Sequence, residues 1–171
     1  MTEGMRLRPV NEQDLEVLEM MFSNPDEIGL FNWGGFRDWT DWRRRWNQNR
    51  LLAEDKSVLM IDLAGDTLGF VSWHAVMTGA TSRCVEFGIS LMSSARGQGH
   101  GTAAQRLLAS YLFDTTQTHR IQAFTDAGNR AEQRSLEKAG FTREAVLKEY
   151  TFRAGEWRDE VLYRMLRTEL P

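Results

Sequence analysis

The feature that most constrains the fold of this chain is a glycine-rich loop at residues 96–102, which reads Arg-Gly-Gln-Gly-His-Gly-Thr. It lies between an expected strand and an expected amphipathic helix. Glycines at alternate positions (Gly97, Gly99 and Gly101) allow positive φ angles and let the backbone come close to a ligand. The N–H groups of such a loop, with the start of the next helix, form a site for anionic oxygens. The loop therefore predicts a pyrophosphate site.

The spacing of these glycines disfavours two common nucleotide sites. A dinucleotide fingerprint needs Gly-x-Gly-x-x-Gly, but Thr102 stands where its third glycine is required. A P-loop ends in Gly-Lys-Ser/Thr, and this loop contains no lysine. Taken alone, the loop is equally compatible with a plain turn that caps a helix.

Hydrophobic patterns along the rest of the chain predict one α+β domain over residues 1–171. Strands are expected at 5–9, 57–63, 67–76, 83–92, 120–125, 143–153 and 157–167. Helices are expected at 12–22 after an Asn11 cap, at 38–53, from the glycine loop to about 114, and from Asn129 to a Gly140 stop. Residues 25–36 are expected to form an irregular loop.

Composition narrows the class of protein further. The net charge of −3 gives no electrostatic reason to expect nucleic acid, and no basic block or long apolar run indicates a membrane. Cys84 is the single cysteine, so neither a disulfide within the chain nor a cysteine metal site is expected. The three scattered histidines predict no metal site. These features predict a cytoplasmic monomer or homodimer.

Several motifs, taken in order, resemble the GNAT superfamily of acyl-CoA N-acyltransferases. Arg96-x-x-Gly99-x-Gly101 resembles its pyrophosphate loop, and residues 129–141, ending Glu-Lys-Ala-Gly-Phe, resemble the helix that follows the next strand. Arg143-Glu144, the spacing Gly155-x-x-x-Asp159-x-x-x-Tyr163, and Leu7-Arg8-Pro9 followed by Asp14 look like the Rim-type branch. The resemblance covers nearly the whole chain. It implies a mixed, mostly antiparallel sheet with splayed strands, flanked by about four helices.

The resemblance implies acetyl-CoA as the acyl donor and direct attack by a primary amine in a ternary complex. The backbone at Leu91 and Met92 would contact the pantetheine arm, and an N–H there would polarise the thioester carbonyl. Asn129 would hydrogen-bond the pantetheine, cap its helix, or do both. The pyrophosphate would be held by Arg96, Gly97, Gln98, Gly99, His100, Gly101 and Thr102, with the His100 side chain pointing outward.

The catalytic groups are less clear from the residues. An alkyl amine is mostly protonated at neutral pH, so a base must remove a proton before the amine can attack. Glu86 is the first candidate for this base; the alternative is that Glu86 only faces solvent on a half-exposed strand. Leu136 stands where many relatives have a tyrosine acid, and Glu132 stands where Rim-type relatives have a serine. Glu132 is therefore a candidate acid or substrate contact, or an exposed helical glutamate. Ser135 is a weaker candidate.

The acceptor side is expected to be aromatic. Phe31, Trp33 and Phe36 of the loop would close an acceptor pocket, and His74 is a further candidate, although a structural histidine is the stronger alternative for it. Trp42 and Trp46 are expected in the core, and Arg43-Arg44-Arg45 on a solvated face. Such a pocket favours a small or partly apolar amine, or a short peptide N-terminus. A non-catalytic acyl-CoA sensor or scaffold is the competing function.

Overall fold

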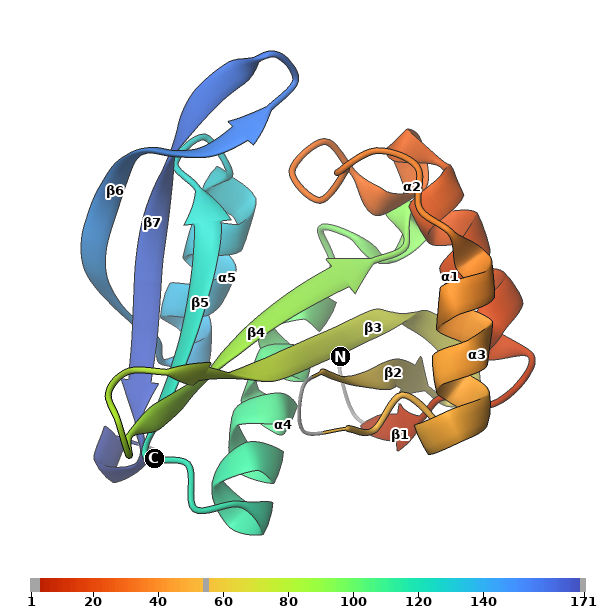
Figure 1. The fold of residues 1–171 in the computed structure, drawn as a ribbon, viewed down its shortest axis with the longest axis horizontal. Helices are drawn as coiled ribbons and strands as arrows, with labels where there is room; N and C mark the ends of the chain where they lie inside the picture. The colour runs from red at the N-terminus through yellow and green to blue at the C-terminus, as the bar shows by residue number, and fades with distance from the viewer. Residues whose placement is uncertain (1–3, 54–55, 170–171) are drawn as a thin grey trace.

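The computed structural model describes residues 4–53 and 56–169, so the ends of the expected 1–171 domain lie outside the described residues. Their core element is one seven-stranded sheet with the order β1-β2-β3-β4-β5-β7-β6 (Figure 1). Only β4 and β5 pair in parallel, and every other neighbouring pair is antiparallel. The strands are β1 (Met5–Pro9), β2 (Ser57–Leu63), β3 (Asp66–Met77), β4 (Arg83–Leu91), β5 (Arg120–Asp126), β6 (Thr142–Arg153) and β7 (Glu156–Leu166). The mixed, mostly antiparallel sheet predicted from the sequence is confirmed.

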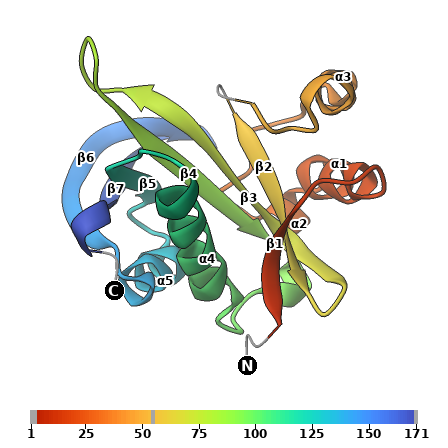
Figure 2. The same cartoon turned by 90° about the horizontal axis from the view of Figure 1, so that it is seen from below.

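Helices cover both faces of this sheet (Figure 2). One face carries α1 (Asp14–Ser23), α2 (Pro25–Ile28) and α3 (Trp39–Asn49), and the other carries α4 (His100–Thr115) and α5 (Arg130–Ala139). Each face has its own apolar core. Leu18, Met21 and Trp42 pack against β2 and β3 in the first, while Leu108 and Leu136 pack against the centre of the sheet in the second. The expected core position of Trp42 is confirmed, and Trp46 packs against the same cluster.

Three helix boundaries differ from the sequence predictions. The 25–36 segment, expected as an irregular loop, begins with the single helical turn α2, which Asn24 caps. This turn is too short to produce a periodic hydrophobic pattern in the sequence. α1 begins at Asp14, because Asn11 and Asp14 exchange side-chain to backbone hydrogen bonds that hold the preceding turn. α3 ends at Asn49, because Arg50 and Leu51 adopt positive φ angles of 57° and 58°. No helix among the described residues has the length and apolarity needed to cross a membrane.

The buried side of α4 is wider than the sequence pattern predicts. Helical spacing predicts an apolar face of Ala104, Leu107, Leu108, Tyr111 and Leu112; Ala104, Leu108 and Leu112 are buried, but Tyr111 is exposed, whereas Gln105 and Phe113 are also buried. α4 packs against both the sheet and α5, so its buried surface is wider than a single apolar stripe. A hydrophobic pattern assigns polar residues to the solvent side of a helix, so it could not predict that Gln105 is fully buried.

Candidate active site

The candidate site lies where β4 and β5 separate. The two strands pair only at Val85↔Ile121 and Glu86↔Gln122, and they then diverge (Figure 1). A cavity of about 190 Å³ lies in the opening. Its lining comes from the 29–38 loop, β4, β5, α5 and the β6–β7 hairpin: Phe31, Asn32, Phe87, Gly88, Ile89, Ala123, Phe124, Thr125, Asp126, Asn129, Glu132, Arg153 and Glu160. The splayed strands expected from the sequence therefore create an opening in the sheet itself.

The glycine loop leads from the end of β4 into α4. Gly97 and Gly99 have positive φ angles of 74° and 83°, and Gly99 is the N-cap of α4. No described atom lies within 4 Å of the position that a Cβ on Gly99 would take, so the loop is open on that side. Because the N-cap is a glycine, it has no side chain to satisfy the first N–H groups of this 16-residue helix. This arrangement fits a pyrophosphate, whose oxygens would accept from those groups.

Three residues of the loop make contacts that the sequence did not predict. The Arg96 guanidinium donates to the carbonyls of Leu91 and Asp26, at 3.0 and 3.2 Å, and to that of Glu27, so it ties α2 to the loop with three of its five N–H donors. His100 is buried with only 7% exposure, and the outward orientation expected for it is wrong. A Cβ on Gly101 would point toward Ser135 Oγ at 3.2 Å, so this glycine permits close packing of α4 on α5.

The two backbone positions expected to contact the thioester are not equivalent. The Met92 N–H donates to the Leu68 carbonyl at 2.9 Å, so the polarising role expected for it is wrong. Backbone groups of successive residues in a strand alternate between its two edges. Those of Leu91 therefore face away from β3, and its carbonyl accepts from Arg96. The Leu91 N–H remains the candidate on this strand.

Asn129 lines the cavity and also caps α5. Its side-chain oxygen accepts from the Glu132 N–H at 3.2 Å. The capping bond uses one lone pair of the oxygen, which leaves the amide NH₂ as a donor for a ligand. Both roles expected for Asn129 are thus compatible.

The two candidate carboxylates lie on opposite faces of the sheet. Val85 and Phe87 pack in the core under α4 and α5, so Glu86 between them points to the α1–α3 face. Its Oε2 accepts from Gln122 Nε2 at 3.2 Å, at the point where β4 and β5 still pair. Glu132 extends from α5 and lines the cavity from the other face. Glu132 therefore lines the opening, whereas Glu86 lies on the opposite face at the paired end of the strands, next to the opening and outside the cavity lining.

Glu132 is not the exposed helical glutamate that the sequence left open. Its Oε1 accepts from Gln105 Nε2 at 2.6 Å, and burial raises the pKa of Glu132 to about 7 against the opposing effect of that bond. Ser135 faces α4 instead of the cavity, and its hydroxyl donates to Gln105 Oε1 at 3.1 Å. The structure therefore brings Glu132 to the site and places Ser135 behind it.

The aromatic residues of the loop divide into two groups. Phe31 lines the cavity, whereas Phe36 is 85% exposed and contacts the half-buried Trp33 with ring centroids 5.3 Å apart. Asn32 fastens the loop to β4 by donating to Ser90 Oγ at 3.1 Å. His74 lies opposite Glu86 in the β3–β4 register and so shares its face. Of the three loop aromatics, Phe31 is the one that lines the opening, together with Phe87 and Phe124 of the strands.

Sequence reasoning missed a charged cluster on the cavity wall. Arg153 donates to the Asp126 carboxylate at 2.7 Å and lies 3.6 Å from that of Glu160. Asp126 also accepts from the Gly128 N–H at 2.7 Å, in the turn that leads to α5. These residues lie on β5, β6 and β7 and come together only in the folded sheet. No local sequence motif could therefore have predicted the cluster.

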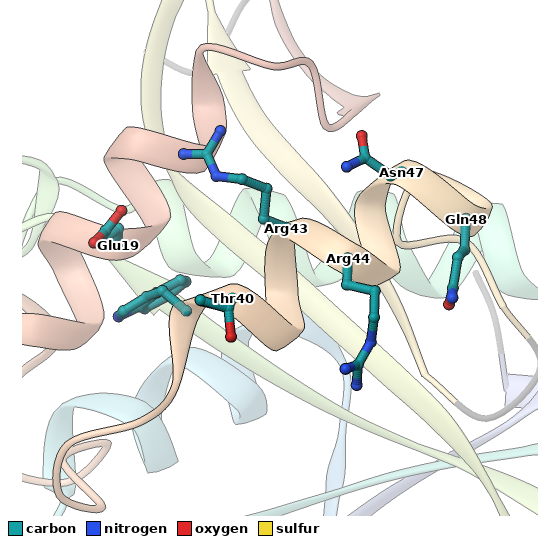
Figure 3. A pocket seen from close by; sticks show the side chains of 7 residues that line it. Glu19, Thr40, Arg43, Arg44, Asn47 and Gln48 are labelled. Carbon is teal, nitrogen blue, oxygen red and sulfur yellow. The ribbon is translucent and has the colours of Figure 1, made fainter.

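A second hollow, of about 530 Å³, lies on the outer surface along α3. Arg43 and Arg44 line it with Glu19 of α1, and their side chains point in different directions (Figure 3). Arg44 is paired with Asp41 of its own helix. The divergence of these side chains agrees with the solvated face expected for the arginine run.

Replacement of Glu132 by glutamine should change how stability depends on pH. Because the pKa of Glu132 is raised to about 7, the folded chain binds the proton more tightly than the unfolded chain does. Folding stability is therefore lost as pH rises from about 4.5 to above 7, by up to roughly 3 kcal/mol. The free energy of unfolding of Glu132→Gln lacks this loss. The difference in stability between variant and wild type should therefore shift in favour of the variant by most of that amount between pH 5 and pH 8. Urea unfolding of both proteins from pH 5 to pH 8 measures this, and a difference that is independent of pH would contradict the buried acid.

Comparisons with known proteins agree with this geometry. Residues 5–142 match the acetyltransferase (GNAT) domain family. The probable N-acetyltransferase YjcK of Bacillus subtilis is 31% identical over 124 residues, which are 71% of this chain and 68% of that protein. The putative ribosomal N-acetyltransferase YdaF of the same organism is 28% identical over 75% of this chain and 67% of its own.

Two solved structures match over almost the whole chain. Mycobacterium smegmatis RimJ in complex with CoA-disulfide superposes with a TM-score of 0.80 at 28% identity, over 98% of this chain and 84% of that one. The spermidine N-acetyltransferase of Vibrio cholerae in complex with CoA and spermine gives a TM-score of 0.84 over 98% of both chains, but at 18% identity it shows the fold alone. The chain therefore belongs to the GNAT family of acetyltransferases, in its Rim-like branch, and is an N-acyltransferase with acetyl-CoA as the donor.

Proposed function

We propose that the acceptor amine and the donor thioester meet in the opening between β4 and β5 from opposite faces of the sheet. The observation that carries this proposal is the pair of carboxylates, Glu86 on the α1–α3 face and Glu132 on the α4–α5 face. The glycine loop and the open start of α4 lie at the end of β4, which suits entry of the donor along α4 and α5. The acceptor then enters past Phe31.

In this arrangement Glu86 removes a proton from the acceptor ammonium, directly or through water. The nitrogen lone pair attacks the thioester carbonyl carbon, and a Leu91 N–H stabilises the developing oxyanion. As the C–N bond forms and the nitrogen gives its second proton to water, the C–S bond breaks, and the sulfur takes a proton from the protonated Glu132. A thiol has a pKa near 8.5, so loss of the acid is tolerated better than loss of the base.

The acceptor in this proposal is a small, partly apolar primary amine or the N-terminus of a peptide. Phe31 supplies an apolar wall, and Arg153 pairs with both Asp126 and Glu160. This pairing leaves one net negative charge on the wall, enough for the reacting ammonium but not for the several cations of a polyamine. The relative YdaF, which is named as a putative ribosomal N-acetyltransferase, favours the peptide alternative. Cytoplasmic location and a monomer or homodimer remain predictions.

The acceptor class is tested by thiol release from acetyl-CoA against matched substrates. We expect turnover with peptide N-termini or small monoamines, and a kcat/KM for spermidine at least about tenfold lower, since a second cation finds no unpaired partner on the Arg153 wall. Calorimetry with acetyl-CoA is run in parallel, so a protein that binds no donor is recognised. A preference for spermidine would contradict the proposed acceptor class, and tight binding without turnover on any amine would support the sensor function instead.

A further inference from the structure

A chain of hydrogen bonds runs from the glycine loop side of α4 to the cavity. Thr102 Oγ1 lies 3.1 Å from Ser135 Oγ, Ser135 Oγ donates to Gln105 Oε1 at 3.1 Å, and Gln105 Nε2 donates to Glu132 Oε1 at 2.6 Å. The four side chains alternate between α4 and α5, so this row of hydrogen bonds joins the two helices; we call these four side chains the seam. Gln105 at its centre has no exposed surface.

We propose that Gln105 is a positioning residue, which fixes the orientation and the proton-carrying oxygen of Glu132. This inference rests on the proposed role of Glu132 as the acid. The geometry carries it. The Gln105 amide is held at both ends, since its oxygen accepts from Ser135 while its NH₂ group donates to Glu132. A flipped amide would lose the Ser135 donor and would place two acceptors together at an ionised Glu132.

The bond also selects which oxygen of Glu132 can act as the acid. A protonated carboxyl has one carbonyl oxygen and one hydroxyl. Gln105 donates to Oε1 and so favours Oε1 as the acceptor whether Glu132 is protonated or ionised. The exchangeable proton is then carried by Oε2, and transfer to a leaving sulfur leaves the Gln105 bond in place. Glu132 can lose and regain its proton without rearrangement of the buried seam.

Other charged groups around Glu132 do not replace this role. Asp126 of β5, Arg153 of β6 and Glu160 of β7 line the same cavity, but they are paired with one another. Glu86 of β4 points to the opposite face of the sheet. Burial and the Gln105 bond are the two influences on the Glu132 carboxyl, and they act in opposite directions. Removal of the donor leaves burial unopposed.

The test compares Gln105→Met with Gln133→Met. Both remove a buried glutamine from the helical layer, but the Gln133 amide donates to the Asp126 and Ala127 carbonyls and not to the Glu132 carboxylate. The titration midpoint of Glu132 is read by carboxyl ¹³C NMR, with its signal identified by loss in Glu132→Gln. Gln105→Met should raise the midpoint by about one pH unit, and Gln133→Met should leave it unchanged. A second variant, Ser135→Ala, frees one end of the amide and should give a smaller rise, which keeps the test available if Gln105→Met does not fold.

Activity measurements separate this inference from the proposed function. If Glu132 is the acid, the alkaline limb of the kcat profile should move with the NMR midpoint in Gln105→Met. A moved midpoint with an unchanged limb would leave Gln105 as the positioning residue and remove Glu132 from the reaction. Midpoints of Glu132 that are equal in the wild type, Gln105→Met and Ser135→Ala would overturn the inference, whatever the activity.

Discussion

Gly99→Asp should lower the affinity for acetyl-CoA by roughly 100-fold or more, because it places a carboxylate beside the start of α4 where the pyrophosphate is expected to bind. The Cβ of a residue at this position would enter the open side of the loop, which has no described atom within 4 Å. Isothermal calorimetry with acetyl-CoA gives the affinity directly.

The matched control is Gly99→Asn. The φ angle of 83° strains both side chains to a similar degree, but asparagine and aspartate tolerate the left-handed region better than most residues. Asparagine has the size of aspartate without its charge, so the difference between the two variants measures repulsion of the pyrophosphate. We expect Gly99→Asn to retain much of the affinity, and the gap between the two to narrow as salt is added. Unchanged affinity in Gly99→Asp would mean that the pyrophosphate binds elsewhere.

Gly101→Asp would disrupt the same region by another route. Its Cβ would point toward Ser135 and Leu91, so the new side chain would wedge α4 away from α5. The sequence suggested that both glycines face the pyrophosphate, because an alternating motif does not reveal which way each Cβ would point. The helix register decides this, and in α4 it turns Gly101 inward. Gly99→Asp is therefore the cleaner test of the loop.

The parts of the fold that the sequence predicted are those with a local cause. Asn129 and Gly140 delimit α5 because an N-cap oxygen and a residue at φ of 104° act within one turn of the chain. The β2–β3 and β6–β7 hairpins follow from turns at Gly65 and Gly155 between β-forming runs. The glycine loop was recognisable because its function depends on backbone conformation, which glycine spacing encodes directly.

The parts that it did not predict depend on contacts across the fold. The hydrogen bonds from Arg96 to two carbonyls of α2 could not be predicted from the loop motif. Gln105 reads as a solvent residue until α5 packs on α4, and Glu132 acquires its raised pKa only through that packing. The Asp126–Arg153 ion pair joins β5 to β6 through two residues that are 27 positions apart in the sequence. The raised pKa and the ion pairs of this site depend on which side chains are buried together, and that cannot be deduced from the order of residues along the chain.

Glu86→Gln should lower kcat/KM by about 100-fold to 10,000-fold near neutral pH, the usual contribution of a positioned base. The substitution keeps the size of the side chain and removes the proton acceptor. Glutamine can turn its amide NH₂ group toward the Gln122 oxygen, so the link between β4 and β5 need not be lost. Affinity for acetyl-CoA should stay within about threefold, because Glu86 lies on the face away from α4 and α5.

The pH profile distinguishes the base from a residue that merely supports the sheet. Loss of the base should remove the rise of kcat/KM on the acidic side, and activity should recover at high pH as the free amine becomes available near its pKa of about 10.4. Glu132→Gln provides the opposite comparison. Loss of the acid should cost most below about pH 7, where Glu132 is protonated, and the difference from the wild type should shrink on the alkaline side, where the wild type loses the same proton. A Glu86→Gln profile that is parallel to the wild type, only lower, would assign Glu86 to the structure of the β4–β5 junction. The proton would then have to leave the amine through another group on the same face, and His74, its neighbour in the β3–β4 register, would be the next residue to replace.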